Sequence, residues 1–586
     1  METLTFREPR LVALAILVLV AAGLSSLLAI GRQEDPTITN LFATVTTAYP
    51  GADPARVESL VTAEIEEKLR EIAEVEEISS TSATGVSIVQ VELVNTLPDD
   101  QIEGVWSEIR DALSDAEAAF PAGALSPDFS SDGTGAYAAI VAITPFEATA
   151  PLSIMGRYGE ELADRLRNAP GTKLAEIFGA PEEEVLVTVD PARAAALGVT
   201  ADQVSAAIGA ADAKMSAGRL RGASNDLILD VAGDISGLDR VGQIILREGA
   251  TGEATRVADV ATVERGPRRP LAEMALHQGA PAVLIAAKLE DGLQVDVWME
   301  RIRGEVAEFA AEAPNGLNVE LIFDQSRYTA DRLAEVAVNM AIGVGLVVVV
   351  LLVTLGIRAA LIVALILPLV SLASIATMNW LGLAIHQMSV TGLIVALGLL
   401  VDAGIVMTDE VGKRIRAGLK RIEAVRGSVR RLFAPLLAST VTTALSFTPM
   451  ILLPGPAGDF VGSIAIAVVV MLSWSFVVAV TITPAIAGWT LRTQGGFGEG
   501  VSIPPLARFF AGSLRLALAH PIRAAALAAS PAILGFAAMP TLTAQFFPGV
   551  DRDQFHIEVD LRPGASIAQT EAVARRLNDV LSDAPE

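Results

Sequence analysis

Long apolar runs dominate the hydrophobic pattern of this chain. Residues 11–30 contain no charge, and a helix of this length crosses ~30 Å of hydrocarbon at ~1.5 Å per residue. The run has neither the shorter apolar core nor the small-residue cleavage site of a signal peptide, so we expect a retained span. Five further clear runs and a weaker seventh follow residue 335, at residues 336–355, 359–381, 390–408, 432–453, 460–491 and 522–542.

The sixth and seventh runs each carry proline. The run 460–491 is too long for one perpendicular span, so we expect it to protrude or to break near Pro484. Pro531 and Pro540 interrupt the seventh run, which makes it the weakest of the set.

Basic residues in the short loops indicate the orientation. Residues 413–431 hold eight Lys or Arg, and the turn after the second run holds Arg358. The turns 382–389 and 454–459 hold none. We therefore expect a multi-pass protein with a cytoplasmic N-terminus and a large external segment, which in a Gram-negative cell lies in the periplasm.

Charge divides the chain in the same way. The 586 residues include 43 basic and 68 acidic ones, a net charge of −25, yet the mean hydropathy is +0.49. Residues 31–335 alone carry 52 acidic and 24 basic residues, a net charge of −28. The separation of acidic and apolar segments excludes a single soluble enzyme domain and a disordered tail. The acidic surface excludes a nucleic-acid binder, because it repels phosphate. The absence of cysteine excludes disulfides, thiolate metal sites and a cysteine nucleophile.

The external segment alternates between strand and helix patterns. Asp53 is the expected N-cap of the first helix, and Pro98 precedes the second. The order strand–helix–strand–strand–helix–strand predicts a split βαβ (ferredoxin-like) unit with its helices on one sheet face. The strands that we expect in it are 40–48, 77–81, 86–94 and 137–144.

The same order then restarts, which predicts a second, similar unit. Its expected elements are helix 152–168, strands 174–178 and 184–189, helix 201–211, strand 282–289, helix 296–312 and strand 318–323. A Gly-rich, β-leaning insertion at 214–270 interrupts it. The sequence therefore predicts an α+β membrane protein, with a polytopic helical bundle and a large external domain.

A larger repeat spans the whole chain. Pro50-Gly51-Ala52 follows the first span, and Pro563-Gly564-Ala565 occupies the equivalent place after the seventh. Repeats of this size are usual in transporters. The alternative is that the two segments are unrelated strand–turn–helix units with similar sequence patterns. Because the second copy ends inside its first helix, we expect a chain cut after its seventh span, from a protein of about 1,000 residues.

Asp402 is the one acid in the middle of an apolar run. An ionised carboxylate at that depth costs ~2.5–3.5 kcal/mol even on lenient scales, so it is functional by default. It is tolerated if it is protonated or paired with a cation, and a group that alternates between those states carries protons. A static ion pair, or a hydrogen bond to Thr440, Thr442 or Thr443, is the structural alternative. The flanking Gly398 and Gly404 would permit close helix approach.

This layout resembles the resistance–nodulation–division (RND) efflux permeases. The resemblance covers the whole chain and rests on "TAYPGADPARVE", "LGIRAALI", "LGLLVDAGIVMTDEV" and "TITPAIAG". It is closest to the hydrophobe/amphiphile (acriflavin-resistance) type. It implies an inner-membrane homotrimer driven by proton entry, which works with a periplasmic adaptor (membrane fusion) protein and an outer-membrane channel.

The resemblance also implies domain roles. Residues 1–31 are the first span, 32–335 the porter and docking region with its docking insertion at 214–270, and 336–491 spans two to six. Residues 492–521 are a cytoplasmic linker helix, 522–542 the seventh span, and 543–586 the start of a second porter unit.

The implied proton relay begins at Asp402 and has candidate cytoplasmic members in Asp409 and Glu410. For Asp409, a solvated helix end is the favoured interpretation, and a cytoplasmic proton exit is the alternative. Drug exporters commonly carry a second aspartate where this chain has Ala403, whereas heavy-metal exporters resemble this chain. The relay's basic and hydroxyl partners would belong to spans beyond residue 586.

Tyr137 and Phe178 match aromatic positions of the multidrug pocket, although either could be a core aromatic. We predict no enzyme activity and no cofactor, because the sequence shows no Ser/His/Asp set, HExxH motif or P-loop at a membrane face. The scattered methionines and the four scattered histidines predict no metal site. The leading hypothesis is proton-driven export of small hydrophobic or amphiphilic compounds. Heavy-metal export and a half-length, non-transporting partner subunit remain the alternatives.

Overall fold

The computed structural model describes residues 3–131, 136–146, 150–211, 216–221, 226–230, 237–248, 254–491, 504–542, 555–562 and 564–582. The chain forms two compact units, which we describe separately. The first comprises Met1–Ala136, Asp291–Asp296 and Gln325–Asp560. The second comprises Tyr137–Glu290, Val297–Asp324 and Leu561–Glu586.

The first unit contains the long apolar helices. Seven helices among the described residues are long and apolar enough to cross a membrane, and each predicted run overlaps one of them. They are α2 (Pro9–Ala29), α12 (Gln325–Leu355), α13 (Ile357–Trp380), α14 (Gln387–Arg416), α15 (Arg421–Ile451), α16 (Gly455–Thr490) and α18 (Pro521–Ala538). The short helices α1 (Leu4–Arg7), α17 (Pro504–Ala519) and η3 (Met539–Thr541) adjoin them.

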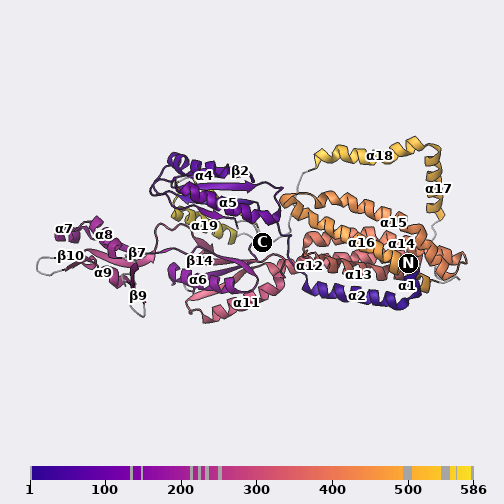
Figure 1. The fold of residues 1–586 in the computed structure, drawn as a ribbon, viewed down its shortest axis with the longest axis horizontal. Helices are drawn as coiled ribbons and strands as arrows, with labels where there is room; N and C mark the ends of the chain where they lie inside the picture. The colour runs from indigo at the N-terminus through magenta and orange to yellow at the C-terminus, as the bar shows by residue number, and fades with distance from the viewer. Residues whose placement is uncertain are drawn as a thin grey trace. The chain divides into compact units, whose positions relative to one another are not determined.

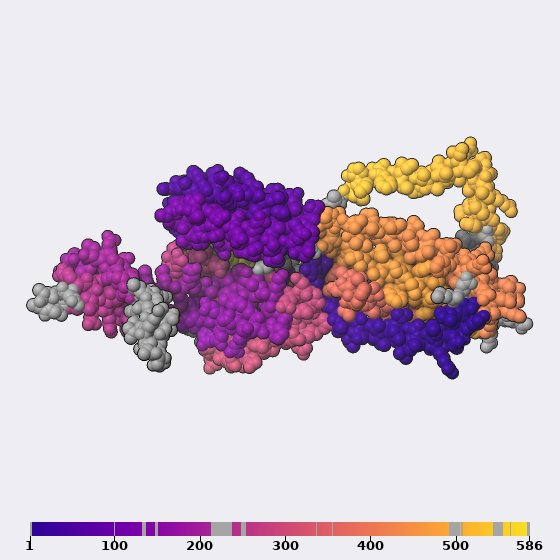
Figure 2. All heavy atoms as spheres, viewed as in Figure 1, coloured from indigo at the N-terminus to yellow at the C-terminus, as the bar shows by residue number. Residues whose placement is uncertain are grey.

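The helix bundle is held by apolar side chains and a few polar links. Figure 1 shows α13, α14 and α16 side by side, and α16 also contacts α15. The indigo side chains of α2 lie directly on the bundle in the space-filling view (Figure 2), and α2 packs mainly on α13. At one end of the bundle, the ring of Phe6 stacks on Trp489 with 6.1 Å between centroids.

Helix α16 does not break at Pro484. Its 36 residues form one helix, about 54 Å long at ~1.5 Å per residue, so it exceeds the ~30 Å hydrocarbon core. Pro484 is buried within the bundle, and neighbouring helices commonly make proline tolerable in such spans. The expectation of a break is therefore wrong.

An antiparallel sheet completes the first unit. Its strands are β1 (Phe42–Ala48), β2 (Val75–Ala83), β3 (Val86–Leu93) and β4 (Asp128–Ser130), in the order β2-β3-β1-β4. The helical stretch α3 (Pro54–Val57), η1 (Glu58–Thr62) and α4 (Ala63–Leu69) and the helix α5 (Asp99–Glu117) pack around Val45, Val89 and Trp106. As predicted, the Asp53 carboxylate caps the first helix, accepting from the backbone N–H of Arg56 at 3.0 Å.

The strand predicted to close this sheet belongs to the other unit. Residues 139–145 form β5 (Ala139–Pro145), which lies between β14 (Ala280–Leu289) and β15 (Leu317–Asp324). The short β4 takes its expected place beside β1. Strand β4 has only three residues, too few for a recognisable alternating pattern, so the sequence did not predict it. Strand β5 is apolar and buried, as a central strand is.

The second unit is built on that sheet. Its strand order is β13-β14-β5-β15, where β13 is the short strand Ala275–His277, and β6 (Thr172–Phe178) also pairs with β14. Helix α6 (Leu152–Asn168) packs on β6 and β14. The unit also contains α11 (Val295–Glu312), most of which falls within it, and α19 (Ile567–Ser582).

The strand expected at 184–189 does not join this sheet. It forms β7 (Glu183–Val189), which pairs along its whole length with β12 (Ala261–Pro267). Val185 and Leu186 are exposed, so β7 is not a core strand of the main sheet. The segment outside the main sheet therefore begins at β7, well before residue 214.

Short elements lie between β7 and β12. They are α7 (Pro191–Leu197), α8 (Ala201–Ala211), β8 (Ser216–Arg221), β9 (Asp226–Asp230), α9 (Leu238–Gly242), β10 (Ile245–Glu248), β11 (Ala254–Arg256) and α10 (Val257–Val260). Helices α7 and α8 meet at an angle of 84°, and together they are long and apolar enough to resemble a broken membrane span. Val199 and Val204 pack in a small core with Val257, so this pair is part of a folded subdomain.

The predicted second copy of the strand–turn–helix is only partly described. Pro563 lies outside the described residues, and α19 follows it as expected. Residues 555–562 form no strand with any described segment, because a strand requires a hydrogen-bonded neighbour.

Candidate functional site

Helix α14 presents two different faces. Leu397, Leu400 and Met407 belong to a buried stripe that packs mainly on α16. Val395, Leu399, Asp402 and Val406 recur at helical spacing on the opposite face and are exposed. Asp402 therefore lies midway along the helix, within an apolar stripe that the described part of the chain leaves open.

Asp402 forms no hydrogen bond or ion pair with any residue that the structure describes. The predicted hydroxyl partners on α15 are occupied locally. Thr442 donates to the carbonyl of Ala438 at 2.7 Å, and Thr443 donates to that of Ser439 at 3.0 Å. No contact of Thr440 with Asp402 is present among these residues either. The site thus consists of one carboxylate on an open apolar face.

Two polar links hold the neighbouring helices together, and neither was predicted. The hydroxyl of Ser475 donates to the carbonyl of Leu400 on α14 at 3.0 Å. The indole of Trp474 donates to the hydroxyl of Thr377 on α13 at 2.8 Å. These two bonds connect α14 to α16, and α16 to α13.

Close helix approach occurs at Gly392, six residues before Gly398, the first of the two predicted glycines. A Cβ at Gly392 would lie 2.5 Å from the carbonyl oxygen of Ile464 and 2.9 Å from the Cβ of Ala467. A Cβ at Gly398 would meet nothing within 4 Å, and one at Gly404 would only touch Val363. Gly392, not Gly398, sets the distance between α14 and α16.

The acids at the end of α14 lie in a network of ion pairs. Asp409 contacts the Nζ of Lys413 at 2.5 Å and Arg416 at 3.7 Å. Glu410 contacts Arg414 at 2.8 Å and Arg431 at 3.5 Å. Both carboxylates are therefore compensated as anions, unlike Asp402.

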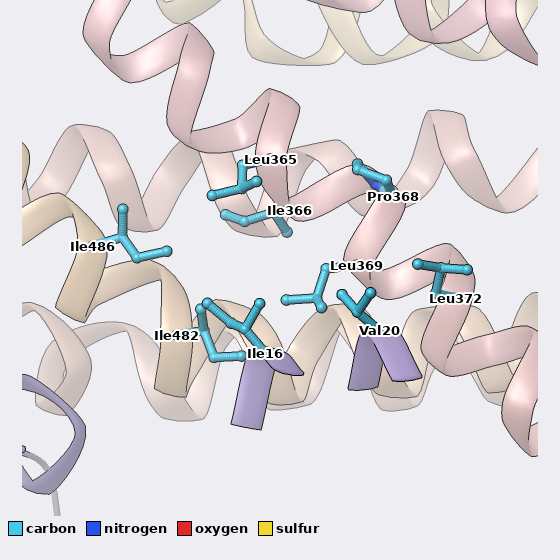
Figure 3. Close-up of a pocket in the computed structure, with 9 residues that line it drawn as sticks. All are labelled: Ile16, Val20, Leu365, Ile366, Pro368, Leu369, Leu372, Ile482 and Ile486. Atoms are coloured by element: carbon cyan, nitrogen blue, oxygen red, sulfur yellow. The ribbon is translucent and has the colours of Figure 1, made fainter. Parts of the chain in front are cut away.

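A small cavity between α2, α13 and α16 contains only aliphatic surface. Figure 3 shows Ile16 and Val20 of α2 facing Leu369 of α13, and Ile482 and Ile486 close the other side. Its volume is about 90 Å³. No lining side chain can carry a charge, so none of them can donate or accept a proton.

The second unit brings Tyr137 and Phe178 together. Their ring centroids lie 5.9 Å apart at an interplanar angle of 79°. The phenol of Tyr137 donates to Glu176, and the Nζ of Lys288 lies 4.8 Å from the centre of the Tyr137 ring. Burial and the hydrogen bond to Glu176 raise the pKa of Tyr137. Glu176 and Lys288 were not singled out in the sequence, because only the fold brings them beside the aromatic pair.

Among the described residues, no group of three or more His, Cys, Asp or Glu side chains is arranged to hold a metal ion. The histidines His277 and His386 lie in different units.

Comparison with known proteins identifies the family. The model of the AcrB/AcrD/AcrF family matches residues 1–586. The multidrug resistance protein MdtC of Yersinia pseudotuberculosis serotype O:3 (strain YPIII) is 26% identical over 527 residues, which cover 88% of this chain and 51% of that protein. MdtC of Yersinia pestis is 26% identical over 528 residues, with the same coverage. The chain thus spans about half the length of the curated relatives it matches. The resemblance inferred from the motifs is confirmed, and the chain belongs to the AcrB/AcrD/AcrF family of RND permeases.

Proposed function

We propose that this chain acts in proton-driven export of small hydrophobic or amphiphilic compounds. The observation that carries the proposal is Asp402, a lone carboxylate midway along α14 on an otherwise apolar exposed face. A charge in that position is costly, and such residues mark ion and proton pathways. The function is that of a secondary transporter and not of an enzyme.

The proposed cycle alternates the charge of Asp402. When the carboxylate takes a proton, its face becomes neutral and can pack against apolar surface. When it loses the proton, it requires a cation or water. Because Ser475 links α14 to α16, each change shifts a pair of helices rather than one side chain. Glu410, with Asp409 as a second and dispensable group, is the proposed cytoplasmic route for the released proton.

The sheet-containing regions would bind and release the compound. We propose that both sheets are ferredoxin-like porter units and that the segment between β7 and β12 is the docking insertion. Tyr137 and Phe178 would offer aromatic area to an amphiphile, since stacking and apolar burial suit such ligands.

The cellular setting is proposed from the family and the charge pattern. We place the chain in the inner membrane with a cytoplasmic N-terminus, periplasmic sheet regions and a homotrimeric assembly. A periplasmic adaptor and an outer-membrane channel would be its partners. The relatives are named multidrug resistance proteins, which favours drug-like compounds over heavy-metal cations.

Replacement of Asp402 tests the proposal. Cells that express the protein as it is naturally made would be loaded with a fluorescent amphiphile and energised, and efflux would be compared at equal protein level. We expect Asp402→Asn to abolish efflux and Asp402→Glu, which keeps a titratable group, to retain part of it. Glu423→Gln, which removes an exposed carboxylate on α15, is the matched control. Wild-type efflux by Asp402→Asn would refute the proton-carrying role.

A further inference from the structure

The aliphatic cavity between α2, α13 and α16 is large enough to hold part of another molecule. Its volume of about 90 Å³ is about six times the ~15 Å³ that one water molecule needs. The lining side chains are all aliphatic, so they offer water no hydrogen-bond partner. Cavities of this kind stay dry and accept small apolar groups. An occupant must therefore present hydrocarbon.

The cavity opens to the outside of the bundle along α13. Leu365 and Pro368 line it (Figure 3), and both are exposed, Leu365 to 52%. Their neighbours Ile366 and Leu369 are buried and form the inner wall. Because α2, α13 and α16 are all long and apolar enough to cross a membrane, the medium at this opening is lipid hydrocarbon. The acyl chain of a neighbouring lipid can therefore enter the cavity.

A stripe on α13 leads from the cavity to the start of the helix. Residues at spacings of three and four share one face of this helix, and here they are Arg358, Leu361, Leu365, Pro368 and Leu372. Leu361 is 61% exposed and extends the uncovered apolar surface of Leu365. Arg358 and Leu365 are seven residues apart, about 10 Å at ~1.5 Å per residue. The exposed guanidinium of Arg358 thus lies at the end of an apolar path into the cavity.

Helix α2 runs beside α13 in the same direction. Val20 faces Leu369 across the cavity (Figure 3). Three residues further along both helices, a Cβ at Gly23 would lie 2.5 Å from the Cβ of Leu372. Residue 20 is therefore level with residue 369, and both helices begin at the same end of the bundle.

That end of the bundle carries excess positive charge. Ten residues before this level, α2 reaches Arg10 and α13 reaches the residue next to Arg358, so the two arginines lie at a similar height. Both are exposed, and neither forms an ion pair with any residue that the structure describes. The exposed Arg7 adds a third cation, and Glu8 is the one acid beside them in the sequence. An anion at this height would meet uncompensated guanidinium groups.

We propose that this site binds an anionic phospholipid. The phosphate contacts Arg358 and Arg10, and one acyl chain follows Leu361 and Leu365 into the cavity. Trp489, whose indole donates to a backbone carbonyl just before α2, is of a residue type enriched at membrane–water interfaces, where head groups lie. The positive charge selects an anionic head group over a zwitterionic one with the same chains. The site is separate from Asp402 and from the aromatic pair of the second unit.

Photolabelling of the naturally expressed protein in phosphatidylcholine nanodiscs tests this directly. The probes are a phosphatidylglycerol and a phosphatidylcholine that carry the same photoactivatable diazirine in one acyl chain. We expect the phosphatidylglycerol probe to label the cavity walls more strongly than the phosphatidylcholine probe in mass-spectrometric maps. Arg358→Gln should reduce the phosphatidylglycerol labelling roughly fivefold. It should leave the phosphatidylcholine labelling unchanged, which also shows that the variant is folded.

Three further variants make the test decisive. Val20→Phe should fill the cavity and reduce labelling of its walls by both probes, whereas Val18→Phe, at a position of α2 that is 52% exposed, should not. Arg426→Gln removes an exposed arginine of α15, a helix that does not line the cavity, and should change neither labelling. Equal labelling by the two probes would overturn the proposal, as would phosphatidylglycerol labelling that is unchanged in Arg358→Gln and Val20→Phe. The readout is lipid binding, so a failure of the export proposal would not affect it.

Discussion

Asp409 and Lys413 form an ion pair of 2.5 Å one helical turn apart on α14, whereas Asp402, two turns before Asp409, has no such partner among the described residues. The two acids share a helix and differ in their surroundings. One is a compensated anion at a basic helix end. The other is a lone acid on an apolar face, so their replacement should have very different effects.

We expect Asp409→Asn to reduce efflux less than twofold. Asp409 is partly exposed, and exposed ion pairs contribute only about 0–1 kcal/mol. Initial efflux rates at matched expression, compared with those of Glu410→Gln, would measure the effect. A tenfold loss in Asp409→Asn would instead assign Asp409 an obligatory place on the cytoplasmic proton route.

Gly392→Ala should destabilise the helix bundle by about 1–3 kcal/mol, the usual cost of overpacking. The new methyl group would press on the backbone of Ile464, which cannot move without α16. Thermal unfolding of the purified protein in detergent would report it. Gly398→Ala is the matched control, because its Cβ enters open space. Equal melting temperatures for the two variants would contradict this account of the helix contact.

Phe178→Ala should selectively impair export of aromatic compounds. Phe178 is half-buried and pairs edge-on with Tyr137, so its loss removes contact surface without opening a core cavity. Drug susceptibility measured with an aromatic and an aliphatic cation would show the difference. Phe309, 2% exposed, provides the control. Phe309→Ala should cost about 3–5 kcal/mol and reduce export of both compounds through lower protein level.

His386 should make the protein less stable in acid. Burial lowers its pKa to about 4 from an ordinary value of 6.5. Between pH 6.5 and pH 4, His386 is therefore protonated in the unfolded chain but not in the folded chain. The free energy of unfolding decreases as the pH drops through this range. The loss at pH 5 should be roughly 2 kcal/mol.

The melting temperature between pH 7.5 and pH 5 measures this loss. His386→Asn keeps a side-chain acceptor for the N-terminus of α14 and has no titration in this range. It should therefore show a smaller decrease than the wild type. An identical decrease in both proteins would assign the acid sensitivity to other groups.

Local patterns in the sequence predicted much of the fold. Each charge-poor apolar run overlaps a long helix, because a membrane span requires a continuous stretch of about 20 apolar residues, which the sequence shows directly. Asp53 was recognisable as a cap because the capping bond reaches only three residues ahead. Asp402 was identifiable because a carboxylate within an apolar run can be recognised from the sequence alone.

Tertiary structure alone decided which segments meet. The apolar, β-rich residues 137–144 predict a strand but not its partner, and the fold places β5 beside β14 and β15. Gly392, rather than Gly398, is the helix contact because α16 happens to cross there. The open face around Asp402, the Tyr137–Glu176 hydrogen bond and the cavity between α2, α13 and α16 also depend on segments far apart in the chain. Hydrophobic periodicity records burial along one segment, and it carries no record of which distant segment provides the covering surface.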